Sequence, residues 1–191
     1  VVRQAAIRCR LRGKVMVVDT VLLQIVAYSL SILMLAAGAQ KLAYRQQFAG
    51  ALAAYELAPA WSMLLLLWLI PLLELSVGAG LLFAPERPVF IAAAALLFGI
   101  YALAMVINLW RGRHDIDCGC QLGSAPQQIS YALVVRNLLL ILAACVLLLP
   151  AGERASHWFD YGVICFGVAM ACLLYGAGNN LVATHKRLLA L

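Results

Sequence analysis

Five long apolar segments dominate this chain and determine the class of fold that it can adopt. The run from Pro88 to Trp110 contains no Asp, Glu, Lys or Arg, and each of the other four carries at most one such residue. Roughly 20 helical residues cross the hydrocarbon layer of a bilayer, so these runs predict transmembrane helices. We place the spans at 20–41, 61–84, 89–110, 130–149 and 158–178. We therefore expect an all-α integral membrane protein, a compact bundle of about five transmembrane helices.

The basic residues predict how this bundle lies in the membrane. Five of them precede the first span, within a tail at 1–19, and such an excess of Lys and Arg favours the cytoplasmic side. The segments 42–60 and 111–129 and a short C-terminal tail at 179–191 would then lie outside. If translation begins at Met16, the tail charges vanish and the same rule favours the reverse orientation. The net charge of +6 is spread over termini and loops, so it does not indicate a nucleic-acid partner.

The polar loop at 111–129 contains two cysteines one residue apart. Cys118 and Cys120 flank Gly119, which lets the backbone bend sharply. We expect both to lie in water, where a cysteine is explained by bonding or by reactivity. The pair could close a strained, easily reduced disulfide, or act as a dithiol that attacks a mixed disulfide. A structural disulfide and two unreactive thiols are the alternatives. Together with His114 the two cysteines give the loop three candidate metal ligands, whereas a zinc ion takes four, so we expect no metal site.

Flanking charges do not identify the attacking cysteine. The arginines before the pair lower a thiol pKa, whereas the neighbouring aspartates raise it. Which of the two cysteines attacks is therefore left open.

Ionisable residues inside the predicted spans are the second candidate site. Glu74 lies about 20 Å along its helix, at a depth where a carboxyl group normally faces the bundle interior and is protonated or paired. Arg136 could reach it across a difference in depth, and Lys41 and Asn108 are the other candidate partners. These polar groups could serve helix packing alone, or form the centre of a small transporter.

Three further cysteines, Cys145, Cys165 and Cys172, lie within predicted spans. Cys165 and Cys172 are seven residues apart and share one helical face, from which they could relay electrons to a quinone. They are too far apart to bond each other along a helix, and we favour a role as apolar filler. No cofactor is certain from the sequence, and a quinone is the candidate.

Several local motifs occur in a recognisable order. Gly38-Ala39-Gln40-Lys41-Leu42 ends the first span, Pro71-Leu72-Leu73-Glu74-Leu75 lies in the second, Asp117-Cys118-Gly119-Cys120 follows the third, and Arg136-Asn137 opens the fourth. Phe48, Tyr55, Leu57 and Pro59 lie between the first two spans. This ordered set, from about Val17 to Leu149, resembles the methylamine utilisation protein MauE family, within the wider DoxX-like membrane family.

The resemblance implies a role in maturing methylamine dehydrogenase. The small subunit of that enzyme is exported to the periplasm, carries many disulfides and holds a tryptophan tryptophylquinone cofactor. MauE-like proteins are thought to act with MauD, a thioredoxin-like partner, in forming or rearranging those disulfides. For this chain the resemblance implies a multi-pass protein of the bacterial inner membrane, with its cysteine loop in the periplasm and Cys118 and Cys120 as the redox pair.

The resemblance leaves two functions open. The chain could be a thiol–disulfide oxidoreductase component, or a non-enzymatic membrane anchor for the thioredoxin-like factor, with the cysteine pair as a structural bond. One departure bears on partner contacts, because many relatives read C-G-C-F-G, whereas here Gln121-Leu122-Gly123 follows the second cysteine.

Overall fold

The computed structural model describes residues 18–113, 116–119, 128–152 and 157–189. Within these residues the chain is helical and forms no named strand, which confirms the predicted all-α class. The helices are α2 (Thr20–Ala43), α3 (Arg45–Tyr55), the 3-10 turn η1 (Ala60–Ser62), α4 (Met63–Phe83), α5 (Pro88–Trp110), α6 (Tyr131–Val146) and α7 (Trp158–Leu189).

The predicted spans correspond to helices, with differences at their ends. Four segments are long and apolar enough to cross a membrane, namely Thr20–Ala43, Ala60–Phe83, Pro88–Trp110 and Trp158–Leu181. The segment predicted at 130–149 contains α6, whose 16 residues extend about 24 Å, less than the hydrocarbon thickness of about 30 Å. The predicted end of the last span at 178 lies within a helix, because α7 continues to Leu189.

Local sequence explains several helix ends. Asp19 caps α2 by accepting a hydrogen bond from the backbone N–H of Val21 at 2.8 Å. Pro88 begins α5, where its missing N–H costs nothing. Glu56 adopts a left-handed conformation after α3 and ends that helix.

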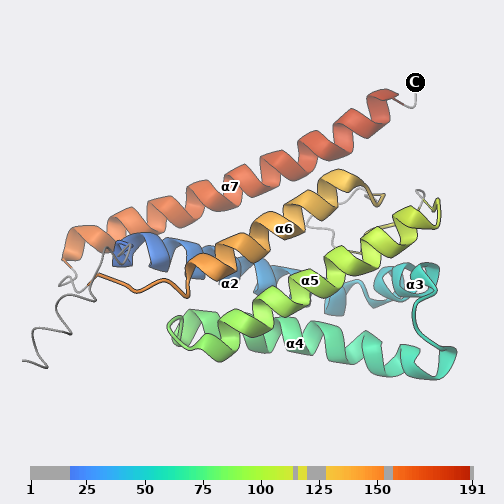
Figure 1. Ribbon diagram of the computed structural model, residues 1–191, viewed down its shortest axis with the longest axis horizontal. Coiled ribbons are helices and arrows are strands. Elements are labelled where there is room, and N and C mark those ends of the chain that lie inside the picture. The colour runs from blue at the N-terminus through green and yellow to red at the C-terminus, as the bar shows by residue number, and fades with distance from the viewer. Residues whose placement is uncertain (1–17, 114–115, 120–127, 153–156, 190–191) are drawn as a thin grey trace, which may run out of the picture.

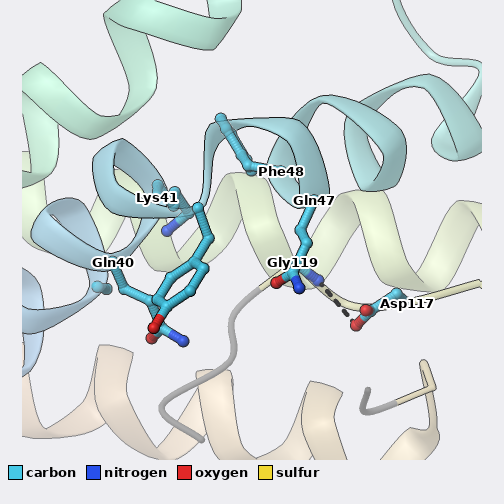
Figure 2. Close-up of a pocket in the computed structure, with 8 residues that line it drawn as sticks. Gln40, Lys41, Gln47, Phe48, Asp117 and Gly119 are labelled. Atoms are coloured by element: carbon cyan, nitrogen blue, oxygen red, sulfur yellow. Dashed lines mark hydrogen bonds between the residues drawn. The ribbon is translucent and has the colours of Figure 1, made fainter. Parts of the chain in front are cut away.

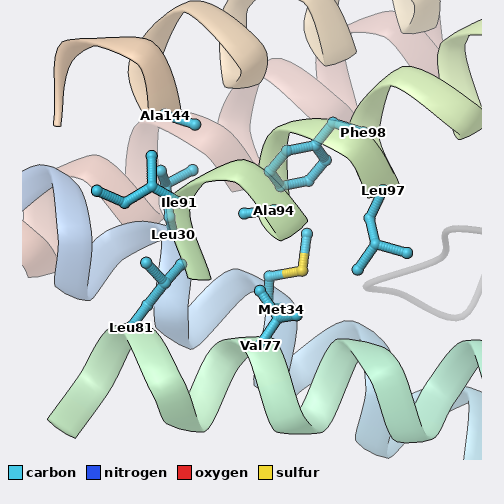
Figure 3. Close-up of a cluster of buried hydrophobic side chains, with 9 residues drawn as sticks. All are labelled: Leu30, Met34, Val77, Leu81, Ile91, Ala94, Leu97, Phe98 and Ala144. Carbon is cyan, nitrogen blue, oxygen red and sulfur yellow. The ribbon is translucent and has the colours of Figure 1, made fainter. Parts of the chain in front are cut away.

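An apolar core joins α2, α4, α5 and α6 (Figure 3). We use "apolar core" for its nine buried residues, which are Leu30, Met34, Val77, Leu81, Ile91, Ala94, Leu97, Phe98 and Ala144. The most extensive contact in the molecule is between α2 and α4. Gly38 makes this approach possible, because a Cβ atom there would lie 2.9 Å from Leu75 Cγ and 3.0 Å from the Pro71 carbonyl oxygen.

The helices alternate in direction, so the bundle has two distinct ends (Figure 1). One end holds the turn between α4 and α5, the start of α2 and the end of α6, where Thr20 Oγ1 donates a hydrogen bond of 2.6 Å to the Gly152 carbonyl. The opposite end holds α3, the end of α2, the end of α5 and the start of α6. We call this second region, with Lys41 and the segments 116–119 and 128–130, the cysteine end.

Helix α3 was not predicted from the sequence. It lies in the segment 42–60, and it packs against α4 with Phe48 and Ala51 buried. Seen in Figure 1, α4 and α5 diverge from their common turn towards the cysteine end, where α3 lies. The short helix therefore covers the part of the bundle that contains Cys118.

Candidate functional site

Cys118 is held in a short return of the chain between α5 and α6. The backbone N–H of Ile129 donates to the Ile116 carbonyl at 2.9 Å, and Asp117 and Gln128 form an antiparallel bridge. Cys118 is buried in an apolar cluster with Met105, Leu109, Ile129 and Leu133. The expectation that this cysteine lies in water is therefore wrong, because the return tucks it against the ends of α5 and α6.

The cover over Cys118 comes from α3. The Tyr55 hydroxyl donates a long hydrogen bond of 3.4 Å to the Cys118 carbonyl oxygen. A Cβ atom on Gly119 would lie 3.3 Å from the Cβ atom of Ala51, so the chain passes close to the helix. Cys120 and His114, the other loop residues singled out from the sequence, lie outside the described residues.

Gly119 has the backbone conformation that the cysteine motif was expected to need. Its φ is +65°, in the left-handed region that favours glycine, and Asp117 Oδ1 accepts a hydrogen bond from its N–H at 3.4 Å. The residue after Cys118 therefore has the left-handed backbone that glycine adopts without strain.

A buried ion pair lies beneath this loop. Lys41 Nζ lies 2.6 Å from Glu74 Oε1 and 2.7 Å from Oε2, and the Tyr101 hydroxyl donates to Oε1 at 2.7 Å. The Lys41 and Glu74 side chains are 5% and 1% exposed, so both charges are removed from solvent. Lys41 also lies in the last turn of α2, where the helix dipole favours a cation. Glu74 thus faces the bundle interior, as its depth predicts, and Lys41 is its cationic partner.

The other candidate partners of Glu74 are engaged elsewhere. Arg136 Nη1 donates to Asn179 Oδ1 at 2.7 Å and its guanidinium lies 5.6 Å from the centre of the Tyr175 ring, so it links α6 to α7. Asn108 is buried and donates to the Ala104 carbonyl of its own helix at 3.1 Å. Of the three candidate partners of Glu74, Lys41 is therefore the one that contacts it. Arg136, which the transporter alternative paired with Glu74, instead contacts α7.

Asn137 has a structural arrangement like that of Asn108. It is buried, and its side-chain amide donates to the Leu133 carbonyl at 2.9 Å. Cys145, Cys165 and Cys172 are exposed on α6 and α7. They do not fill the interior of the bundle, so the predicted role as core filler does not fit their positions.

Two cavities meet at Lys41. The smaller, of about 30 Å³, is lined largely by polar residues of α2, α3 and the loop; Figure 2 shows Gln40, Lys41 and Gln47 around it with Asp117 and Gly119. The larger, of about 200 Å³, is mostly apolar and lies among α3, α4 and α5. Its lining includes Lys41, Tyr101 and Cys118. The cysteine and Lys41, the cation of the buried pair, thus line one cavity.

An ion pair outside the membrane spans ties α3 to the chain after α5. Arg113 Nη2 lies 2.6 Å from Glu56 Oε2, and Arg113 Nη1 donates to the Ala54 carbonyl at 3.3 Å. The hydrogen bond from Arg113, and then its positive charge, lower the pKa of the Glu56 carboxyl. This contact holds the end of α3 beside the chain that leads into the cysteine loop.

Tyr101 is the residue of this site that sequence reasoning missed. It lies within the uncharged run at 88–110, where it reads as one more large apolar residue. The available signal was its hydroxyl, because a buried tyrosine usually finds a hydrogen-bond partner for that group. In the middle of a span, the nearest ionisable partner was Glu74.

Comparison with known proteins identifies relatives of this chain. Residues 19–151 match the family model described as methylamine utilisation protein MauE. The methylamine utilization protein MauE of Paracoccus versutus is 39% identical over 154 residues, which cover 80% of this chain and 82% of the relative.

Two more relatives carry the same name. The protein of Paracoccus denitrificans is 37% identical over 130 residues, 66% of this chain and 69% of the relative. That of Methylorubrum extorquens is 34% identical over 152 residues, 78% of this chain and 81% of the relative. No solved structure matches the chain. Together with four helices capable of spanning a bilayer, these matches show that the chain is a multi-pass membrane protein that belongs to the MauE family of methylamine utilisation proteins.

Proposed function

We propose that this protein exchanges disulfides with a thioredoxin-like partner such as MauD during maturation of the periplasmic methylamine dehydrogenase small subunit. Cys118 and Cys120 are the reacting pair. The observation that carries the proposal is the position of Cys118, which lines a cavity at one end of the bundle together with Lys41, the cation of a buried ion pair. A cysteine that served only as filler would not need a charged side chain in the wall of the same, otherwise mostly apolar, cavity.

The exchange balances as two thiol–disulfide steps. A thiolate of the reduced partner attacks one sulfur of the Cys118–Cys120 disulfide, and a mixed disulfide forms as the other sulfur leaves as a thiolate. The partner's second thiol then attacks the mixed disulfide, so the partner is oxidised and the pair is reduced by two electrons. The same steps in reverse describe oxidation of the pair.

The two cysteines have different roles in this scheme. Cys118 is buried beneath α3, so a large protein partner has little access to its sulfur. We therefore assign Cys120 to the mixed disulfide with the partner and Cys118 to its resolution. The cysteine end faces the periplasm in this proposal, and a reporter fused within 111–129 should give a periplasmic signal.

Trapping of the mixed disulfide tests this assignment. Cys118→Ser should accumulate a covalent complex with a partner variant that keeps only its attacking thiol, detected on non-reducing gels, because neither the partner's second thiol nor Cys118 is then present to resolve the mixed disulfide. Cys120→Ser should not, and Cys145→Ser should behave as the wild type. Absence of the complex in both loop variants, with the proteins inserted normally, would refute the exchange.

The anchor function is the second candidate, and one observation favours it. Cys118 is packed within an apolar cluster, as a structural disulfide would be. An anchor would bind the partner without a covalent intermediate, and its loop pair would stay oxidised throughout maturation. Alkylation of the thiols of this protein in cells, at intervals during maturation, would separate the two functions. A loop pair that is never alkylated indicates the anchor, and a pair that alternates between the alkylated and the oxidised form indicates disulfide exchange.

A further inference from the structure

The larger cavity at the cysteine end has the shape and position of a ligand site. It measures about 200 Å³, and apolar side chains of α3, α4 and α5 form most of its wall. Ile100 of α5 lines it and is half exposed within a membrane span. This part of the cavity wall therefore borders the lipid, which is the side from which an apolar molecule would approach the cavity.

The Lys41 ammonium in this wall determines which chemical group of a ligand can bind there. Lys41 Nζ has three N–H groups, and two of them are directed to the Glu74 carboxylate. The third has no oxygen or nitrogen acceptor among the described residues, and Nζ lies 5.8 Å and 5.2 Å from the centres of the Phe48 and Tyr101 rings, which line the cavity with Lys41. An apolar cavity does not hold water well, since a buried water needs two to four polar partners. A ligand oxygen would supply the missing acceptor.

The charge of the pair indicates a neutral ligand. The Lys41 ammonium is balanced by the Glu74 carboxylate, so an anion entering the cavity would leave a net buried negative charge. A carbonyl oxygen accepts the same hydrogen bond without that cost. The volume is below the range of about 300–1,000 Å³ that is typical of sites for whole drug-sized molecules, and it suits a single ring with its chain outside in the lipid.

We propose that this cavity binds the ring of a membrane quinone. One quinone carbonyl accepts a hydrogen bond from Lys41, and Cys118 lies in the wall of the same cavity. The redox role of this site rests on the proposed function above. Closure of the Cys118–Cys120 dithiol to a disulfide releases two electrons and two protons. One quinone takes up the two electrons and the two protons and becomes the quinol. The two cysteines are thereby reoxidised for the next exchange.

Binding of a short-chain quinone to the purified full-length protein tests the site directly. The probe is a decyl-substituted benzoquinone, added to the protein in nanodiscs. Ala104 lines the cavity, so Ala104→Leu fills it and should weaken binding about tenfold or more. Ala92→Leu makes the same change at an exposed position on the same helix and should bind as the wild type.

The outcomes separate this site from the exchange function. Failure of the wild type to bind, equal binding by Ala104→Leu, or displacement of the quinone by oleate at equal concentration would each overturn the quinone site. None of these results would affect the trapped complex with the thioredoxin-like partner. If Ala104→Leu does not fold, cross-linking of an azido-benzoquinone to the wild type decides the question. Labelled peptides that contain the lining residues of α3, α4 or α5 support the site, and labelling confined to α6 and α7 overturns it.

Discussion

The apolar core and the cysteine end are built largely from the same helices, yet they are arranged differently. In the apolar core, α2, α4 and α5 approach closely and meet through aliphatic and aromatic side chains (Figure 3). At the cysteine end, α4 and α5 diverge, and the space between them is occupied by α3, a buried ion pair and a cavity (Figure 1). The first region is filled with side chains, whereas the second is left partly open.

The difference reflects what a bilayer does and does not stabilise. Lipid is as apolar as a leucine side chain, so helices in a membrane gain little by burying apolar surface and associate through close packing. Buried charges are costly in lipid and are normally kept for a function. The Lys41–Glu74 pair at the cysteine end is therefore expected to matter for activity, and the apolar core for assembly of the bundle.

The largest effect is expected from breaking the ion pair on one side. Lys41→Met leaves the Glu74 carboxylate buried without its cation, which should cost about 3–5 kcal/mol of stability. The double variant Lys41→Met, Glu74→Leu removes both charges and should recover most of that loss. SDS-induced unfolding of all three proteins measures the difference. Equal stability of the single and double variants would show that the pair does not hold the two helices together.

Glu74→Gln refines the same comparison. The amide oxygen can still accept from Lys41 and Tyr101, so Glu74→Gln should be better tolerated than Glu74→Leu, by about 1–3 kcal/mol. SDS-induced unfolding again gives the measurement. If the two variants behave alike and assemble normally, hydrogen bonding at this position is unimportant.

A cavity in the apolar core should have a smaller effect than in a soluble protein. Leu81 is fully buried, and Leu81→Ala would cost about 3 kcal/mol or more in a soluble core. Because the unfolded helices remain in lipid, the transfer part of this cost is largely lost, and we expect about 1–2 kcal/mol from lost packing. Leu72→Ala, at an exposed position of the same helix, is the matched control and should have almost no effect.

A matched pair of glycines separates backbone strain from packing at the cysteine end. Gly119 and Gly112 both have a left-handed φ, of +65° and +73°. Gly119→Ala adds a contact with Ala51 of α3, whereas the corresponding Cβ atom at Gly112 meets nothing within 4 Å. Each substitution should cost about 1–2 kcal/mol in backbone strain, and Gly119→Ala should additionally raise the alkylation rate of Cys118 by loosening α3. Equal alkylation rates in both variants would show that α3 does not control access.

The smallest effect concerns pH. Arg113 lowers the pKa of Glu56 below its ordinary value of 4.5. The stabilisation from this contact is therefore present above the ordinary pKa and is lost as the pH falls through the lower, folded-state pKa. The contact is exposed, so the change should be small and weakened by salt. The difference in melting temperature between wild type and Glu56→Gln should shrink below pH 4.5. Glu86→Gln, in the turn at the other end, should show no such trend.

Composition was sufficient to predict the bundle but not the helix at its end. The spans are recognisable because each needs a long run without charges, and the helices follow those runs closely. Helix α3 mixes Arg45, Gln46 and Gln47 with small apolar residues over 11 positions. A segment this short and this polar has no transmembrane signal, and its helix is stabilised by packing against α4.

The partner of Glu74 depends on helix register, which a single sequence does not reveal. Glu74 lies deep in its span, whereas Lys41 is near the end of α2, so their positions in the sequence predict different depths for the two residues. In the structure, Gly38 packs against Pro71 and Leu75, and this contact brings Lys41 opposite Glu74 one turn later. The burial of Cys118 was missed for a similar reason, because it requires α3 and the return of the chain at 128–130.

The rate at which the dehydrogenase small subunit acquires its disulfides tests the central claim most directly. It should be measured on non-reducing gels in cells that carry either of two variants. Cys118→Ser, Cys120→Ser removes the proposed redox pair and should abolish maturation. The control Cys145→Ser, Cys165→Ser, Cys172→Ser removes the exposed cysteines of α6 and α7 and should leave the rate close to that of the wild type. Normal maturation with the loop pair removed would contradict the redox function and favour the anchor.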